Sequence, residues 1–503
     1  MSIQNKKGMV MLTVSYVVVA VLLILGVVFF ARSLSEHRIA QRQKNAVQAL
    51  SIAEAGIDRL VYNLKLDFKL DTSNPSWTDG FLYFEGSFIS WGPNYDDFYV
   101  FIDWTDLGNG QYRVELKNVS SKNDEMWVRS TARVGDIEKT IQVYLKTRNF
   151  NIWNNAIFAG SGASGAMING NVDIRGSVHI LGDGLTPFDY AFDMGGSAKV
   201  GNNYDGISAT LLSKIPPCPT VEFNGETVES LETAVRVKHG LAGLSGTAKL
   251  GESDSTGDSY KETVDTVYVT DGYGGNKGEE NVYSDNGTEN MYDLGDAVTF
   301  PSLSDPYETY ATYLDYLKDN ALVISDLGEL SQLANIKPNS SFTYTDAGGK
   351  GSISMDGSGN LAIDGIVYID SGGDFKMIQQ GGNTTINYTG KGSIVATGNV
   401  EIKVNLYTSG NNSFPNNIIG VMTPNTILFD TSQIDVMGAF YAEDTIDCNK
   451  QTEVAGAFVS NFFDMGSQVP NIYQVPALAD NLPPGMINSN PIWVVVNVAW
   501  QEL

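Results

Sequence analysis

The sequence is poor in the residues on which most catalytic and metal centres depend. Its 503 residues include 3 histidines and 2 cysteines, and Cys218 and Cys448 stand far apart in the chain. No C-x-x-C pair, Cys/His cluster, H-E-x-x-H or P-loop motif occurs, which excludes the usual zinc sites and several common catalytic motifs. Spacing alone leaves open whether the two cysteines form a disulfide or stay as separate thiols. We assign no catalytic residue and no metal ligand.

One glycine-rich stretch, residues 160–165, reads GSGASG and satisfies the G-x-G-x-x-G pattern. A dinucleotide site of that kind needs a helix directly after the glycines, because the helix N-terminus binds the pyrophosphate. Residues 167–178 read MINGNVDIRGSV and alternate like a strand, so we reject the motif. The 58 acidic residues make chance carboxylate pairs inevitable, and glycosidase chemistry is not assigned from them.

Basic residues are scarce and unevenly placed, because 32 Lys and Arg against 58 Asp and Glu give a net charge of −26. Residues 1–70 hold nine basic and four acidic side chains, which leaves 23 basic and 54 acidic side chains, or −31, for the rest. Such an acidic body repels phosphate backbones and argues against a nucleic-acid partner. It suits either a solubilised extracellular surface or the binding of divalent cations.

Acidic side chains gather in loops rich in Asn and Gly between residues 251 and 290. Oxygen ligands of this kind suit calcium, although no EF-hand loop is present. No other cofactor is expected, and a solvated acidic surface is the alternative interpretation of these loops. The candidate calcium ligands are Asp254, Asp258, Asp271, Glu279, Glu280, Asp285 and Glu289.

The longest uncharged run of the chain, Met9–Ala31, has 23 residues and is closed by Arg32. As a helix it spans a hydrocarbon core of ~30 Å, whereas the apolar part of a cleaved secretory signal has only ~7–15 residues. Lys6 and Lys7 precede the run and place the N-terminus in the cytoplasm. The run therefore predicts a single membrane-spanning helix with the bulk of the chain outside the cytoplasm.

The helical pattern continues beyond Arg32. Apolar residues recur at roughly helical spacing as far as Leu64, and no proline occurs before Pro75. Residues 9–66 are thus predicted to form one helix, with its transmembrane half at 9–31. Periodicity alone leaves a second possibility, a signal anchor followed by a separate amphipathic helix.

Two motifs frame this helix. A short basic leader ends in Gly8, and residues 49–56 read ALSIAEAG, an A-x-x-x-A-E-A-G segment. Together these features, within the first 65 residues, resemble a type IV prepilin, and the second motif is similar to that of PilX-type minor pilins. The resemblance implies that prepilin peptidase cleaves after Gly8 and that Met9 becomes the N-methylated N-terminus. It further implies that the helix leaves the inner (cytoplasmic) membrane and packs into a filament with other pilin subunits and the assembly machinery.

The resemblance also identifies Thr13 and Glu54 as filament-packing positions. Thr13 stands at the fifth mature position, where major pilins carry a glutamate that PilX-type proteins and tip pseudopilins commonly lack. If that carboxylate normally pairs with a neighbouring subunit's N-terminal amine, a chain without it suits a tip or initiating position. A permanently membrane-bound protein is the alternative.

The remainder of the chain reads as β structure, so the predicted fold class is α+β. Residues 67–148 are expected to form a pilin-like antiparallel head, irregular over 67–95 and then with strands at 98–104, 111–117, 126–134 and 137–146. Short strands in 149–204 and 341–503 indicate a β-solenoid-like domain, with a β-sandwich as the alternative. Residues 205–340 are predicted to be a polar insertion with one helix, Asp305–Ile324.

These features predict a non-enzymatic structural protein, a minor pilin or tip pseudopilin of a type IV pilus or related secretion filament. We expect it to take part in filament assembly and surface adhesion, with surface glycans as further partners. The alternative is a membrane-anchored surface protein whose β-solenoid binds or cleaves polysaccharide.

Overall fold

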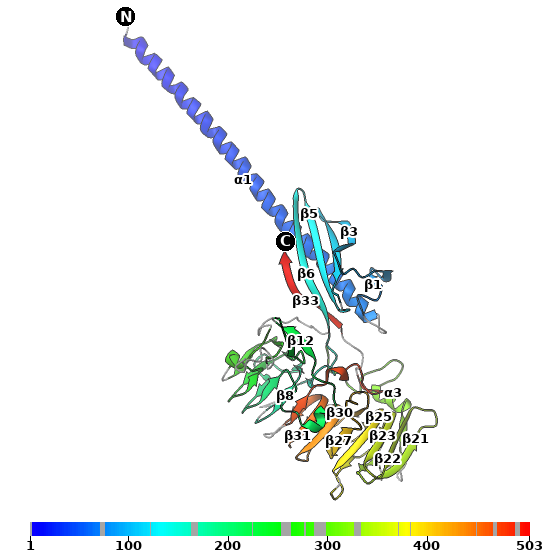
Figure 1. The fold of residues 1–503 in the computed structure, drawn as a ribbon. Coiled ribbons are helices and arrows are strands. Elements are labelled where there is room, and N and C mark those ends of the chain that lie inside the picture. The colour runs from blue at the N-terminus through cyan, green and yellow to red at the C-terminus, as the bar shows by residue number, and fades with distance from the viewer. Residues whose placement is uncertain are drawn as a thin grey trace. The chain divides into compact units, whose positions relative to one another are not determined.

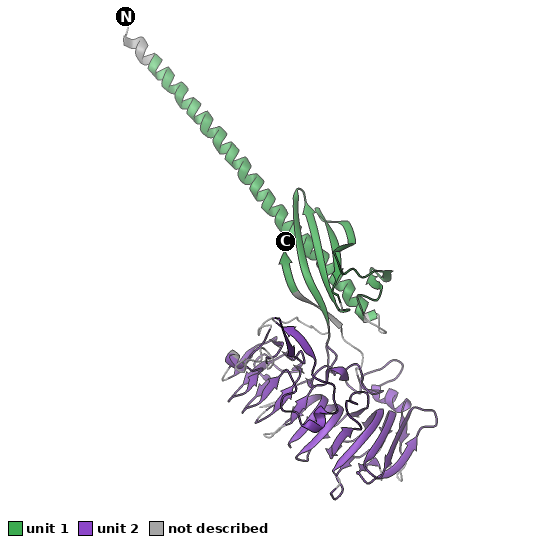
Figure 2. Ribbon diagram, viewed as in Figure 1, with its two compact units in different colours: residues 1–148, 493–503 green, residues 149–492 purple. Residues whose placement is uncertain are grey.

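The chain forms two compact units in the computed structural model (Figure 2). Unit 1 consists of Met1–Arg148 and Trp493–Leu503, and unit 2 is Asn149–Ile492. The structure describes residues 3–503 except 71–75, 121, 162–167, 169, 224, 253–262, 276–277, 286–297, 326–332, 371, 383, 449, 466–469 and 488–492. Each unit is described separately below.

Unit 1 begins with one uninterrupted helix, α1, from Ile3 to Leu70 (Figure 1). The predicted continuation beyond Arg32 is confirmed, since no proline or cap residue breaks the pattern and the helix extends four residues past the predicted end. Its first half is not buried by any other part of the chain that the structure describes, and its second half lies on a sheet.

An antiparallel meander covers the second half of α1. The strands are β3 (Tyr99–Leu107), β4 (Gly110–Asn118), β5 (Glu125–Val134) and β6 (Ile137–Asn149), and they pair in chain order. The four-strand prediction is confirmed, with boundaries shifted by a few residues. The residues before β3 are predicted to be irregular. In the structure, β1 (Phe81–Phe84) and β2 (Ser87–Ser90) form a hairpin there.

The fifth strand of this sheet is the C-terminus, β33 (Trp493–Glu502), which lies beside β6. The sequence prediction assigns residues 341–503 to the β-solenoid-like domain, but these last residues belong to unit 1. Val495 packs into the core of unit 1, and the Leu503 N–H donates to the Thr140 carbonyl at 3.0 Å.

Unit 2 is built mainly of parallel strands stacked side by side. Along one side of the stack, neighbouring strands pair in parallel through ten levels. In spatial order these strands are β19 (Leu322–Ile324), β23 (Asn360–Ile369), β25 (Thr385–Ala396), β28 (Ile418–Thr423), β30 (Ile434–Asp447), β31 (Thr452–Asp464), β7 (Ile157–Ala159), β9 (Val178–Ile180), β14 (Ala234–Val237) and β17 (Thr266–Val269).

Shorter strands form the other sides of the stack. A second ladder runs through β27 (Asn405–Thr408), β30, β31, β32 (Asn471–Tyr473), β8 (Asp173–Arg175), β11 (Lys199–Gly201) and β16 (Lys249–Leu250). A third joins β20 (Asn335–Ile336), β24 (Phe375–Ile378), β26 (Val400–Lys403), β29 (Ile427–Leu428) and the end of β30. The remaining strands are β10 (Tyr190–Met194), β12 (Thr220–Phe223), β13 (Glu226–Glu229), β15 (Leu241–Leu244), β18 (Tyr273–Gly275), β21 (Ser341–Thr345) and β22 (Gly351–Asp356).

The chain enters and leaves unit 2 in the middle of the stack. From β7 it proceeds through β9 and β14 to one end, and from β19 it returns level by level from the other end until β31 pairs with β7. The first and last segments of unit 2 in the sequence also contact each other, because the Trp153 indole N–H donates to the Ile487 carbonyl at 2.9 Å. Segments about 300 residues apart in sequence are thus neighbours in one ladder.

The sequence repeat of Gly, Ala and Phe corresponds to two neighbouring levels. Gly438, Ala439 and Phe440 pair in register with Gly456, Ala457 and Phe458. The two phenylalanine rings lie 5.7 Å apart in an edge-to-face contact inside the stack. The 18-residue spacing of the repeat is thus the distance along the chain between two paired strands, β30 and β31.

The polar insertion predicted at 205–340 is only partly an insertion. It contains β14, β16 and β17, which are levels of the stack. The predicted helix Asp305–Ile324 is shortened to α3, Tyr313–Asp319, with Thr312 as its N-cap in place of Asp305. Glu308 lies at φ +50°, which no helix allows, and a second short helix, α2, spans Ala209–Leu212. Short 3₁₀ turns occur at Gly278–Asn281 and Pro476–Leu478.

Candidate functional site

The exposed half of α1 is the most unusual surface of unit 1. Nearly every large apolar side chain from Met9 to Phe30 is at least 45% exposed. Of the helices in the described part of the chain, α1 alone is long and apolar enough to cross a membrane, with a mean hydropathy of 2.9 over its most apolar window. Water solvates such a surface poorly, and its length and apolar composition suit a membrane-spanning helix.

Two predicted site residues lie within this surface. Met9 is 74% exposed, and the Thr13 hydroxyl donates to the Met9 carbonyl at 2.8 Å. Because that bond satisfies its hydroxyl group inside the helix, Thr13 adds no charge and no unpaired donor to the apolar surface. A glutamate at this position would add both a charge and a demand for a partner.

The second half of α1 shows why an alanine- and glycine-rich segment stands at 49–56. Ala49 and Ala53 are fully buried, and the helix comes so close to the sheet at Gly56 that no side chain fits there. A Cβ on Gly56 would lie 2.6 Å from the Ser130 hydroxyl and 2.8 Å from the Tyr112 ring. Glu54, the predicted filament-packing residue, lies on the exposed side of the helix, away from the sheet.

Polar side chains fix the end of α1 to the β1–β2 hairpin. Arg59 donates to the Tyr112 hydroxyl at 2.5 Å and forms an ion pair with Glu85. The Asn63 side-chain oxygen accepts from the Glu85 N–H at 3.1 Å, and the buried Asp67 carboxylate accepts from the Tyr83 N–H. The hydrogen bonds of Tyr112, Asn63 and Asp67 are part-buried and hold the helix at one position on the sheet, whereas the Arg59–Glu85 pair is exposed.

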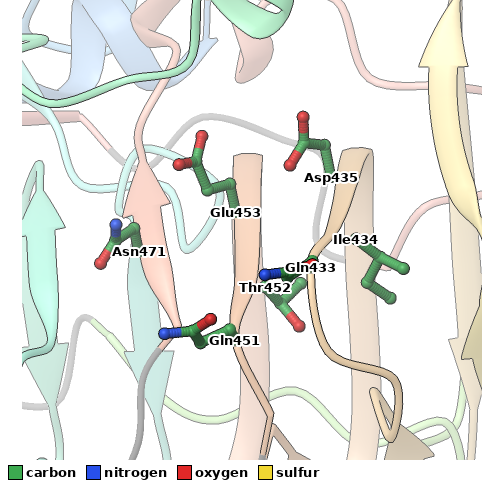
Figure 3. A pocket seen from close by; sticks show the side chains of 7 residues that line it. All are labelled: Gln433, Ile434, Asp435, Gln451, Thr452, Glu453 and Asn471. Atoms are coloured by element: carbon green, nitrogen blue, oxygen red, sulfur yellow. The ribbon is translucent and has the colours of Figure 1, made fainter.

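A second candidate site is a polar pocket of about 300 Å³ in unit 2 (Figure 3). It lies where β30, β31 and β32 begin, and neighbouring strands place Asp435, Glu453 and Asn471 side by side in register. The other lining residues are Gln433, Ile434, Gln451 and Thr452. Polar side chains on adjacent strands stand about 4.8 Å apart, so they form a regular row on this side of the stack.

Neutral donors hold the two carboxylates of the pocket. Asp435 accepts from the Tyr407 hydroxyl at 2.8 Å, and Glu453 accepts from the Ser208 backbone N–H at 3.1 Å. Loss of hydration on burial raises the pKa of Glu453, and the nearby charge of Asp435 adds to the rise. The side-chain oxygen of Asn471 is buried without a hydrogen-bond partner.

The calcium candidates are not brought together. Within the described ranges, no group of three or more His, Cys, Asp or Glu side chains lies close enough to hold a metal ion. Asp271 accepts from the Gly240 N–H and Asp285 from the Thr263 hydroxyl. Glu280 lies in a 3₁₀ turn with Glu279. Asp254, Asp258 and Glu289 lie outside the described residues, as do residues 162–165 of the glycine-rich motif.

The cysteines lie in different surroundings, since Cys448 is fully buried and Cys218 is half-buried. No disulfide joins these two described residues. Burial raises the pKa of the Cys448 thiol to about 12, which makes it a poor nucleophile. The question that spacing left open is thereby answered for Cys448, which is a packing residue.

No family model and no curated protein sequence matches the chain. Among solved structures, the chain is similar to the crystal structure of the competence-associated pilin ComZ from Thermus thermophilus. The two share 19% sequence identity with a TM-score of 0.52, over 91% of this chain and 97% of ComZ. The fold is pilin-like. Because the match covers nine-tenths of the chain, it extends beyond unit 1 into unit 2.

Sequence reasoning missed the pocket in unit 2, although a signal was present. Gln433 and Asp435 recur as Gln451 and Glu453 at the same 18-residue spacing as the Gly-Ala-Phe repeat. Because these polar residues have the same spacing as the apolar repeat, the sequence predicts that they form a row on one side of neighbouring levels. Asn471 carries no such signal, because its position follows from how the returning chain pairs with β31.

Proposed function

We propose that this protein is a minor pilin or tip pseudopilin of a type IV pilus or a related secretion filament, of the PilX type. One observation carries the proposal: a single helix has an apolar half without neighbours and a second half packed on an antiparallel sheet. That arrangement gives the helix two successive surroundings, first lipid and then the helices of other subunits. The pilin-like fold supports it.

In this proposal, prepilin peptidase cleaves after Gly8 and Met9 becomes the methylated N-terminus. Before assembly the protein crosses the inner membrane once, with its C-terminal bulk outside the cytoplasm, and afterwards it lies at the cell surface. Its role is structural and not enzymatic. Surface glycans are the proposed partners of unit 2, whose side carries the polar pocket.

Thr13 supports a tip position over a place in the shaft. Its hydroxyl is satisfied within the helix, so it offers no charge to the N-terminal amine of a neighbouring subunit. Glu54 is exposed and is therefore available to contact a neighbouring subunit, as the resemblance implies. Both roles are open to direct test in assembled filaments.

Mass spectrometry of the mature N-terminus tests the proposal. We expect the protein from sheared filaments to begin at methylated Met9, and a Gly8→Val variant to keep Met1 and stay in the membrane fraction. Wild-type protein that keeps Met1 and is found only in membranes would contradict the proposal. It would favour a permanently anchored surface protein instead.

A further inference from the structure

The pocket in unit 2 holds two carboxylates that no positive charge compensates. Among the residues that the structure describes, no Lys, Arg or His forms an ion pair with Asp435 or Glu453. Their side-chain oxygens accept instead from the neutral groups of Tyr407 and Ser208. On the next strands of the same ladder, by contrast, Asp173 pairs with Arg175 and Lys199. Two neighbouring carboxylates without a cation favour a ligand that brings one.

The rest of the lining is rich in hydrogen-bonding groups. Gln433 and Gln451 directly precede β30 and β31, and the Gln433 N–H donates to the Gln451 carbonyl. Asp435, Glu453 and Asn471 form a row within β30, β31 and β32, where adjacent strands are ~4.8 Å apart. The pocket thus presents several donors and acceptors, which suits a ligand with several hydroxyl groups on a ring (Figure 3).

The charge of the pocket also limits the kind of ligand. A phosphate or carboxylate ligand would be repelled by the two acidic side chains, whereas a cationic ligand would be attracted by them.

We propose that this pocket binds an amino sugar, so that its ammonium group lies between Asp435 and Glu453 and its hydroxyls contact the amides of Gln433, Gln451 and Asn471. The cavity of about 300 Å³ is at the small end of ligand pockets and suits one or two sugar rings. The inference deepens the glycan-binding part of the proposed function. It does not depend on whether the chain enters a filament.

Binding of defined oligosaccharides to the full chain in detergent micelles tests the proposal. We expect a glucosamine hexamer to bind at least tenfold more tightly than the N-acetylglucosamine hexamer, which has the same rings without the charge. Spermidine, which has the charge without the rings, is expected to bind at least tenfold more weakly than the glucosamine hexamer.

Paired variants locate the site. The double variant Asp435→Asn with Glu453→Gln keeps the size of both side chains, and we expect it to lose at least tenfold in affinity for the glucosamine hexamer. The matched control, Asp183→Asn with Asp364→Asn, removes two exposed carboxylates outside the pocket and should bind like the wild type.

Three results would overturn the proposal: no binding of the glucosamine hexamer, equal binding of the N-acetylated form or of spermidine, or equal losses in both double variants. These outcomes are separable from a failure of the proposed function. Filament entry is read from the mature N-terminus of the same protein, whichever sugar it binds.

Discussion

At the scale of single residues, Gly56 sets the distance between α1 and the sheet. The nearest atoms of Ser130 and Tyr112 leave no space for a Cβ, and Tyr112 is itself fixed by the Arg59 guanidinium. Glycine in the middle of a helix costs about 1 kcal/mol relative to alanine. Its presence here is explained by the closeness of the packing, which places the helix directly on β4 and β5.

We therefore predict that Gly56→Ala destabilises unit 1. Forcing an extra methyl into a packed core costs ~1–3 kcal/mol, which exceeds the gain in helix propensity. Gly26→Ala is the matched control, because nothing lies within 4 Å of a Cβ at that position. Tryptophan fluorescence during urea unfolding in micelles reports unit 1, which holds six of the seven tryptophans. An unchanged midpoint for Gly56→Ala would contradict the close packing.

A second residue-scale prediction concerns His179, which is buried on β9 between Phe158 and Arg236. Burial, with the charges of Arg236 and Lys238, lowers the pKa of His179 to about 3. In the unfolded chain the histidine has its ordinary pKa near 6.5. Between pH 6.5 and 3 the unfolded chain therefore binds a proton that the folded chain does not bind. The stability supplied by the neutral ring is complete above pH 6.5 and is lost as the pH falls toward 3.

Comparison with a His179→Leu variant isolates this effect. Between pH 6.5 and 4.5, the free energy of unfolding of the wild type should fall relative to the variant by about 1.4 kcal/mol per pH unit. Urea unfolding followed by circular dichroism at three pH values measures the difference. A difference that stays constant with pH would show that the histidine is protonated in the folded state.

At the scale of elements, β33 completes unit 1 from the far end of the chain. Its Glu502 pairs with Lys139 at 2.5 Å, and Val495 joins the core that α1 and the meander form. The sheet therefore depends on a strand that follows the whole of unit 2 in the sequence. Unit 1 cannot be complete until the last residues are present.

This dependence predicts a large difference between two substitutions in one strand. Val495→Asp places an unpaired charge in an apolar core, which costs on the order of 3–5 kcal/mol and should unfold unit 1. Ala499→Asp adds the same charge at an exposed position of β33 and should have little effect. Tryptophan fluorescence separates the two outcomes, and similar unfolding of both variants would show that β33 is not packed as described.

Local pattern was enough to predict α1 and the strands of the meander, since apolar spacing and glycine turns specify both. It failed for α3, where Asp305, Pro306 and Glu308 imitate a helix start. There the chain instead makes a tight turn at Tyr307–Tyr310, and the helix begins after Thr312. Sequence pattern also could not show that β31 pairs with β7, because that contact depends on the path of the chain between them.

The two candidate sites also differ in how far local sequence predicts them. The apolar surface of α1 and the Thr13 position follow from sequence, because each depends on residues close together in the chain. The pocket depends on the order of levels in the stack, and Asn471 enters it only through pairing with β31. The calcium prediction gains no support among the described loops, because Asp271 and Asp285 are engaged in local hydrogen bonds.

At the scale of the whole molecule, the two units differ sharply in charge. Unit 1 has 17 basic and 17 acidic residues, so the 15 basic and 41 acidic residues of unit 2 account for the entire net charge of −26. The unit that carries the exposed apolar helix is thus neutral, and the unit that carries the pocket is acidic. Acidic charge on unit 2 keeps copies of it apart and attracts cationic ligands.

The insertion of unit 2 between β6 and β33 predicts that unit 1 is independent of it. A chain in which residues 150–491 are replaced by a short Asn-Gly turn should retain the fold of unit 1 in micelles. We expect its unfolding midpoint, read by tryptophan fluorescence, to stay within a few degrees of the wild type. The shortened chain should also lose its binding to an anion exchanger. Loss of the folded signal would show that unit 2 is needed to form the sheet.

The path of the chain through the sheet also has a mechanical consequence. Unit 2 is joined to unit 1 by two peptide segments, one that continues from β6 and one that leads into β33, its neighbour in the sheet. A pulling force on unit 2 is therefore shared by two neighbouring strands, one of which is also held by the Val495 contacts in the core of unit 1. A domain attached by a single terminal strand would instead let that strand peel away one bond at a time.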